Sequence, residues 1–169
     1  MRALVTRRSF VAAGLALGAA VATGAAALRL PLAAPGAVLL SRRELDIVGA
    51  VAEVMFPRDP MPLDGLEAQV PVEVDRILAH LMDTARAAAF RYVLRALEVG
   101  TLASRGRRFT DLPAPERLEV LEAWSLPGVV PRRLGLDAIK LVLGMAYFRH
   151  PAVIAQIGWR TPCSVGGAA

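Results

Sequence analysis

Residues 41–57, with the sequence SRRELDIVGAVAEVMFP, carry the clearest secondary-structure signal in the chain. They open with S-x-x-E, the pattern of a capping box, in which a serine and a glutamate side chain satisfy backbone groups at a helix N-terminus. Apolar residues then recur at helical spacing from Leu45 to Met55, and Pro57 ends the pattern because proline cannot continue a helix. The stretch therefore predicts a helix over residues 42–55.

Helical signals continue along the rest of the chain. The stretch from Phe56 to Gly65 is rich in proline and turn-forming residues, so we expect a loop there. Apolar periodicity then predicts helices over residues 71–82, 84–99 and 131–148, the first two either separate or continuous. A further capped helix, whose N-terminus holds Pro113, Pro115 and Glu116, is marked by Phe109, Leu112, Leu118, Leu121 and Trp124. We expect the helix that begins at residue 84 to end at Gly100, residues 101–108 to form a short basic loop, and residues 152–159 to add a half-buried helical turn.

These helices fit an all-α fold. No segment alternates polar and apolar residues between hairpin turns, so we expect strands to be few or absent. Six apolar residues line one face of the last long helix: Leu134, Ala138, Leu141, Val142, Met145 and Phe148. We predict a single compact domain of about five helices over residues 41–163, followed by a flexible tail at residues 164–169.

The first 27 residues have the layout of an export signal. Arg7, Arg8 and Phe10 stand at the start of an uncharged run that is rich in alanine and glycine. The pattern resembles the twin-arginine signal, which a receptor reads as an address. The alternative is a basic flank beside an ordinary membrane helix. Residues 28–40 would form a linker between this segment and the domain.

Processing of the segment has two alternatives. Small residues at positions 25–27 offer a cleavage site before Leu28, whereas the uncharged run is also about long enough to span a bilayer. We expect cleavage. The protein is then periplasmic or otherwise exported, and it is membrane-associated if the segment is retained.

Composition excludes several classes of protein. The chain has 169 residues, 55% of them apolar, and a single cysteine, which excludes a disulfide framework and cysteine-based zinc or iron–sulfur sites. No glycine-rich dinucleotide-binding loop is present. The formal net charge is +5, but three arginines lie in the first eight residues and the remaining arginines are spread along the predicted helices among glutamates and aspartates. We therefore expect no cofactor in this chain and no nucleic-acid partner.

Candidate catalytic residues are few. His80 lies beside an apolar face without a second histidine at metal-binding spacing, and His150 precedes a proline that interrupts a helix. Glu67, Glu73 and Asp75 could form a carboxylate site, although acids near a helix start are also explained by the helix dipole. An enzyme that uses either histidine with a nearby carboxylate remains a rival hypothesis, and we expect no active site.

Two further features point to contacts with another chain. Arg132 and Arg133 stand where a helix N-terminus favours acids, which either an acidic partner surface or plain solvation would explain. Cys163 has no second cysteine in the chain. In an oxidising compartment it is either a free thiol or half of an intermolecular disulfide.

The order of several motifs resembles the gluconate 2-dehydrogenase subunit 3 family. Residues 40–59, which contain the capped helix and its Phe-Pro-Arg-Asp corner, look like the opening of that family. The second half is matched by F-x-x-L at residues 109–112, R-x-x-x-L-x-x-W at 117–124, Y-F-x-x-P at 147–151 and I-G-W at 157–159. The resemblance covers residues 39–163. The closing motifs are also similar to the helical region that precedes the flavin domain of long-chain alcohol oxidases.

The resemblance implies a small non-catalytic subunit. Such subunits accompany a large flavin-dependent subunit of the glucose–methanol–choline class, which holds the FAD, often beside a cytochrome c subunit. They are thought to stabilise the catalytic chain and to lend it their signal for the twin-arginine translocase. The rival reading is a membrane-tethered helical module that binds a lipid or another apolar ligand.

Four aromatic residues are candidates for the partner interface, because aromatic side chains dominate interface energies. They are Trp159, Tyr147, Trp124 and Phe148. The alternative is that they fill the core of this domain. The core is the better expectation for Trp124 and Phe148, which share faces with leucines, and the interface is the better one for Trp159.

Overall fold

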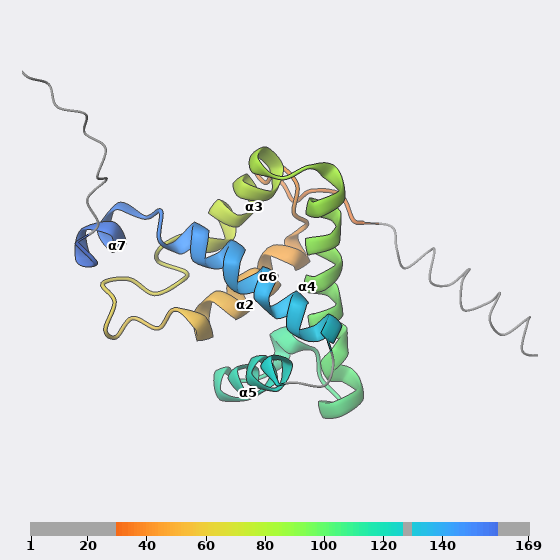
Figure 1. Ribbon diagram of the computed structural model, residues 1–169. Coiled ribbons are helices and arrows are strands. Elements are labelled where there is room, and N and C mark those ends of the chain that lie inside the picture. The colour runs from red at the N-terminus through yellow and green to blue at the C-terminus, as the bar shows by residue number, and fades with distance from the viewer. Residues whose placement is uncertain (1–29, 127–129, 159–169) are drawn as a thin grey trace, which may run out of the picture. The chain divides into compact units, whose positions relative to one another are not determined.

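The computed structural model describes residues 30–126 and 130–158, and the regular structure in these ranges is entirely helical. A single compact unit begins at Leu32 (Figure 1). Its α-helices are α2 (Arg42–Met55), α3 (Val70–Leu81), α4 (Thr84–Arg105), α5 (Ala114–Ser125), α6 (Val130–Tyr147) and α7 (Pro151–Gln156), with a 3-10 turn, η1, at Phe109–Asp111. The predicted all-α fold is confirmed for the described residues.

The helix predicted over residues 42–55 is confirmed, together with its capping box. The backbone N–H of Ser41 donates to the Glu44 carboxylate at 2.9 Å, and the Ser41 hydroxyl accepts from the Glu44 backbone N–H. The same carboxylate accepts two hydrogen bonds from Arg91 on α4, at 3.0 Å and 2.9 Å, and both side chains are buried. Glu44 therefore both caps α2 and joins it to α4.

The central element is α2, which contacts α3, α4, α5 and η1. Residues 47–52 are all buried, and three of them are Gly or Ala, so neighbouring segments can approach the helix closely. Gly65 in the loop after α2 shows how close this approach is. A Cβ on Gly65 would lie 2.5 Å from the backbone oxygen of Ala52.

A buried carboxylate fixes the segment that precedes α2. Asp75 on α3 accepts hydrogen bonds from the backbone N–H groups of Val38, Leu39 and Leu40 at 2.6, 3.0 and 2.6 Å. Leu40 is itself fully buried. The last residues of the expected linker are thus bonded to the helical domain.

The predicted end of α4 was wrong. The helix passes through Gly100 and continues to Arg105, so residues 101–105 are helical rather than part of a loop. It ends at Gly106, which has φ +66° and whose N–H donates to the carbonyl of Leu102. A glycine inside a helix costs only about 1 kcal/mol, whereas a left-handed terminal residue strongly favours glycine. The second glycine is therefore the stop signal.

The apolar face predicted for the last long helix was also largely wrong. The buried side of α6 is formed by Leu136, Ile139, Val142, Leu143 and Ala146 with Gly135 and Tyr147. Of the predicted face, Val142 is buried and Ala138 is partly buried, whereas Leu134, Leu141, Met145 and Phe148 are exposed. The error arises because α6 is apolar on two opposite sides. On α5, Val120 and Leu121 are buried, whereas Leu118, one of the apolar residues that mark this helix in the sequence, is exposed.

Candidate partner-binding surface

The most distinctive surface in the described ranges is an apolar strip on α6. Five large apolar side chains, between 40% and 66% exposed, form what we call the outer face of α6: Val130, Leu134, Leu141, Met145 and Phe148. Their spacings of three, four and seven residues place them on one side of a helix. At 1.5 Å per residue the strip is about 27 Å long.

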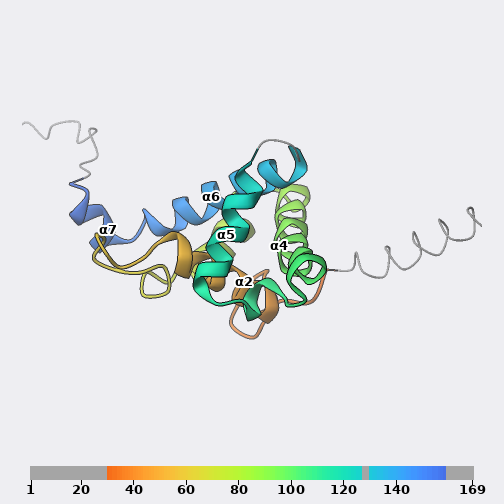
Figure 2. The same ribbon diagram turned by 90° about the horizontal axis from the view of Figure 1, so that it is seen from below.

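The position of α6 in the fold explains why this face is uncovered. The helix crosses in front of α2 and α3 in Figure 1 and runs along the upper edge in Figure 2, with no described segment above it. Its other side packs against α3, α4 and α5. A row of exposed apolar side chains along one side of a helix, unlike single scattered ones, commonly marks an interaction surface. The outer face is therefore a candidate surface for another chain.

An aromatic cluster holds the C-terminal end of this face in place. The rings of Phe56 and Tyr147 stack with centroids 4.3 Å apart, and Phe148 meets both rings edge-on at 6.5 and 5.4 Å. The Tyr147 hydroxyl donates to the carbonyl of Leu63 at 2.6 Å. Phe56 and Tyr147 already restrict the Phe148 ring. The Phe148 side chain would therefore lose little conformational entropy when a partner covers it.

Burial has an electrostatic consequence at Tyr147. Desolvation raises the pKa of the phenol above its ordinary value, and the charge of nearby Asp64 raises it further. The tyrosine therefore stays neutral and keeps donating its hydrogen bond at every pH below about 10.

The apolar surface continues past the end of α6. A hollow lined by Phe148, Arg149, Ile154 and Ile157 lies between α6 and α7. Buried Val153 attaches α7 to the domain, and Nδ1 of His150 accepts a hydrogen bond from the Ala152 N–H at 3.3 Å. His150 thus caps α7.

A groove of about 640 Å³ lies at the other end of α6, between α4, α5 and the first turns of α6. Most of its lining residues are small, among them Ala96, Gly100, Ala103, Ala123 and Gly135, and Trp124 forms one wall. Gly135 permits the close packing here, because a Cβ at this position would lie 3.0 Å from Val93 Cγ1 and 3.5 Å from the Trp124 ring.

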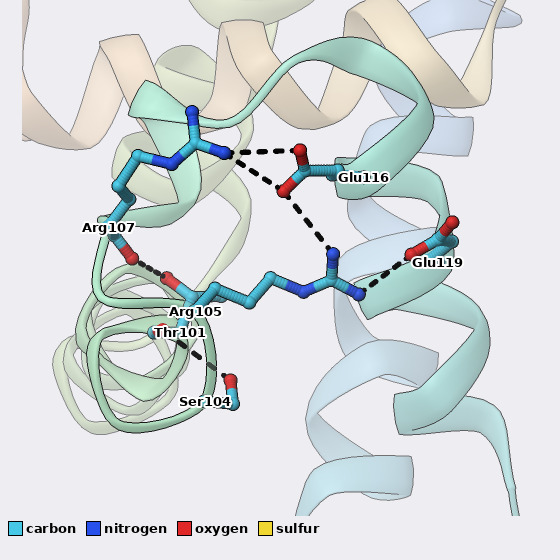
Figure 3. A network of polar contacts seen from close by, with 6 residues as sticks. All are labelled: Thr101, Ser104, Arg105, Arg107, Glu116 and Glu119. Carbon is cyan, nitrogen blue, oxygen red and sulfur yellow. Dashed lines mark hydrogen bonds and ion pairs between the residues drawn. The ribbon is translucent and has the colours of Figure 1, made fainter.

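A charged network joins the helices beside this groove (Figure 3). Arg105 at the end of α4 pairs with Glu119 at 2.8 Å and with Glu116 at 3.3 Å, and Arg107 pairs with Glu116 at 3.1 Å. The hydrogen bond to Glu119 is the main reason that the pKa of Arg105 is raised. Arg107 and Glu119 are exposed, and Arg105 and Glu116 are partly buried, so the contribution of the network to stability is modest and sensitive to salt.

Unpaired cations are concentrated on α6. Within the described ranges, only four Lys or Arg residues have neither an ion pair nor a hydrogen bond from their side chains: Arg108, Arg132, Arg133 and Lys140. Three of the four belong to α6, and no acid lies in its first turn. The sequence singled out Arg132 and Arg133 but not Lys140.

The aromatic candidates have different surroundings. Tyr147 is 1% exposed and belongs to the core, Trp124 is partly buried beside the groove, and Phe148 is half-exposed on the outer face. Trp159 and Cys163 lie outside the described residues, as do Arg7, Arg8 and Phe10 of the expected export signal.

The candidate carboxylates point to different partners. Glu67 pairs with Arg58, and Glu73 pairs with Arg76 and Arg149. Asp75 is occupied by the backbone before α2.

The two histidines do not share a site. His80 is exposed in the last turn of α3, whereas His150 lies in a polar hollow with Glu73, Arg76 and Arg149. In residues 30–126 and 130–158, no group of three or more His, Cys, Asp or Glu side chains could hold a metal ion. No helix in these ranges has the length and apolar character needed to cross a membrane.

Comparison with known proteins gives one match. No curated protein and no solved structure matches the chain significantly. Residues 42–160, however, match the family described as gluconate 2-dehydrogenase subunit 3, and this range spans α2 to α7. The match covers well over half of the sequence, so the chain belongs to the gluconate 2-dehydrogenase subunit 3 family.

Proposed function

We propose that this protein is a non-catalytic accessory subunit that binds and stabilises the flavin-dependent catalytic subunit of a dehydrogenase complex. The family name describes one subunit of a multi-subunit gluconate dehydrogenase, which supports the existence of such a partner. The observation that carries the proposal is the outer face of α6, which nothing in the described part of the chain covers.

The proposal places the redox chemistry in the partner. The sequence has no glycine-rich loop of the kind that binds a dinucleotide, and its candidate carboxylates are paired with arginines or backbone groups. We place the FAD in the catalytic subunit, and a cytochrome c subunit could accept its electrons. The substrate class is that of a gluconate, alcohol or sugar dehydrogenase.

The binding surface can be tested by co-expressing the chain with its flavoprotein. Leu134→Glu with Leu141→Glu places two charges on the outer face without disturbing the core, because both leucines are more than 60% exposed. Truncating a central interface residue commonly costs about 2 kcal/mol or more, so the double variant is expected to bind at least about 100-fold more weakly. The readout is flavin absorbance that co-elutes with the tagged chain.

A matched control tests whether the effect depends on the position of the leucines on α6 or only on the loss of an exposed leucine. Leu81 at the end of α3 is 62% exposed, like Leu141, but it does not lie on α6. Leu81→Glu should leave the co-eluting flavin unchanged. Full binding by the α6 double variant would show that the partner does not use the outer face.

We propose in addition that the N-terminal segment exports both subunits through the twin-arginine translocase to the periplasm. Replacing Arg7 and Arg8 by lysine keeps the charge but removes the arginine pair that the receptor reads. Both this chain and the flavoprotein should then accumulate in the cytoplasm. Unchanged export would favour an ordinary membrane segment with a basic flank.

Cys163 provides a further proposal about the assembly. Because the sequence contains no second cysteine, a disulfide at this residue would be intermolecular, and we place its other half in the catalytic subunit. Non-reducing electrophoresis of the native complex should show one band at the summed mass of the subunits, which Cys163→Ser should abolish. Free migration of the small subunit without reductant would exclude the bridge.

A further inference from the structure

We propose that the outer face of α6 recognises a partner surface in which an apolar strip is bordered by carboxylates. This inference rests on the proposed function and adds the chemistry of the partner's contact surface. It is carried by two cations, Arg133 and Lys140, which have no ion pair within the described ranges and which we call the basic edge.

The basic edge has a regular geometry. Arg133 and Lys140 are seven residues apart, so they lie on the same side of α6 and about 10 Å apart along its axis. Each cation immediately precedes a leucine of the outer face, Leu134 and Leu141 respectively. Consecutive residues lie about 100° apart around a helix, so the two cations border the outer face on one side, where the flanking groups of a partner that covers the leucines can reach them. Seven-residue spacing of charges beside apolar positions is how packed helices commonly select a partner.

The isolated subunit only partly balances the charge of the basic edge. Asp137, four residues from Arg133 and three from Lys140, forms no ion pair with either within the described ranges, so two cations accompany one carboxylate on this side of α6. Arg132 and Arg133 lie in the first turn of α6, where the partial positive charge of the helix N-terminus opposes a cation. Most other described arginines are paired with carboxylates of their own chain. Carboxylates on the partner would supply the missing counter-charges when the complex forms.

A lipid surface fits the same face less well. Asp137 is exposed and lies between Leu134 and Leu141 in the sequence, three residues from one and four from the other, so it is on the same side of the helix. Asp137 is also four residues from Arg133 and three from Lys140, so it lies beside the basic edge as well. An anionic bilayer would place negative charge over Asp137 and the cations alike, whereas a protein surface can place carboxylates against the cations and a neutral group against Asp137. The basic residues also lie along one edge, whereas a membrane-surface helix carries them across its polar face.

The test measures association of the full chain with the purified flavoprotein at 50 and 300 mM salt. The double charge reversal Arg133→Glu with Lys140→Glu is compared with Arg108→Glu, the remaining unpaired cation outside α6. We expect the double reversal to lower the association rate constant at least tenfold at low salt and to remove most of its salt dependence. Arg108→Glu should change neither quantity.

Loss of folding is not expected to complicate the result. Glu at position 133 is favourable for the dipole of α6, whereas Glu at positions 133 and 140 is repelled by Asp137. Both effects are small, so the melting temperature of the double reversal should change little. The double reversal could bind like the unmodified chain while Leu134→Glu with Leu141→Glu does not. In that case the proposed role of the basic edge is wrong and the proposed function stands. If all of these variants bind normally, the outer face is not the partner surface.

Vesicles with phosphatidylglycerol supply the lipid arm of the test. The first 27 residues are removed so that this apolar segment cannot itself insert into the vesicles, and the core stays intact because its buried residues lie between Leu40 and Val153. We expect this shortened chain not to co-float. Co-flotation that the double reversal abolishes, together with unaltered flavoprotein association, would overturn the proposal in favour of a membrane surface.

Discussion

The buried pair of Glu44 and Arg91 is the residue-level contact with the largest expected effect on stability. Arg91→Leu would leave the Glu44 carboxylate buried without its cation, although Ser41 would still donate to it. Breaking a buried ion pair by removing one partner commonly costs about 3–5 kcal/mol. Chemical denaturation should therefore show a loss of this size in the free energy of unfolding.

An exposed ion pair provides the comparison. Arg86 pairs with Asp83 three residues earlier at 3.2 Å, and both side chains are largely exposed. Arg86→Leu should change the free energy of unfolding by no more than about 1 kcal/mol. Equal losses in the two variants would mean that the buried pair has no special role in stability.

Tyr147 gives a prediction about alkaline pH. Its pKa is raised in the folded protein, so the folded state holds the phenolic proton more tightly than the unfolded state. The resulting stabilisation is complete below the unfolded value of about 10 and is lost as pH rises through the folded pKa. Tyr147→Phe should therefore flatten the decline of the melting temperature above pH 10. An unchanged alkaline slope would show that Tyr147 does not cause the decline.

At the level of elements, α4 contains two glycines with opposite roles. Gly100 lies inside the helix, and a Cβ there would meet nothing nearer than the Trp124 ring at 4.0 Å. Gly106 has φ +66°, which side-chain-bearing residues rarely adopt. Gly100→Ala should raise the free energy of unfolding by about 0.5–1 kcal/mol, and Gly106→Ala should lower it by about 1 kcal/mol. Effects of the same sign would contradict the assigned helix end.

The element on which the proposed function depends most is α6. Its buried side packs against α3, α4 and α5, and its outer face exposes large residues that are as apolar as those on the buried side. Apolar periodicity locates such a helix but cannot decide which side turns inward.

At the scale of the whole molecule, stability should depend on the partner. A partner that binds only the folded subunit stabilises it by about 2.7 kcal/mol at a concentration of 100 times the dissociation constant. The melting temperature of the chain should therefore rise when the flavoprotein is added. Leu134→Glu with Leu141→Glu should melt like the unmodified chain when alone and should show no rise. If the flavoprotein raises the melting temperature of this variant as much as that of the unmodified chain, it does not bind through the outer face.

Local signals in the sequence determined where most elements lie. The capping box at Ser41 and Glu44, the proline after α2 and the apolar periodicity located α2, α3, α5 and α6 to within a few residues, because these signals act within one or two helical turns. The order of motifs pointed to the family that residues 42–160 match.

The tertiary structure decided which residues meet across the chain. It paired Glu44 with Arg91, turned Asp75 toward the backbone of residues 38–40, and chose Gly106 rather than Gly100 as the end of α4. It also placed Leu136 and Ile139 inside and Leu134 and Leu141 outside. These choices depend on contacts between residues far apart in sequence, whose free energies no local pattern contains, and they define the surface proposed to bind the partner.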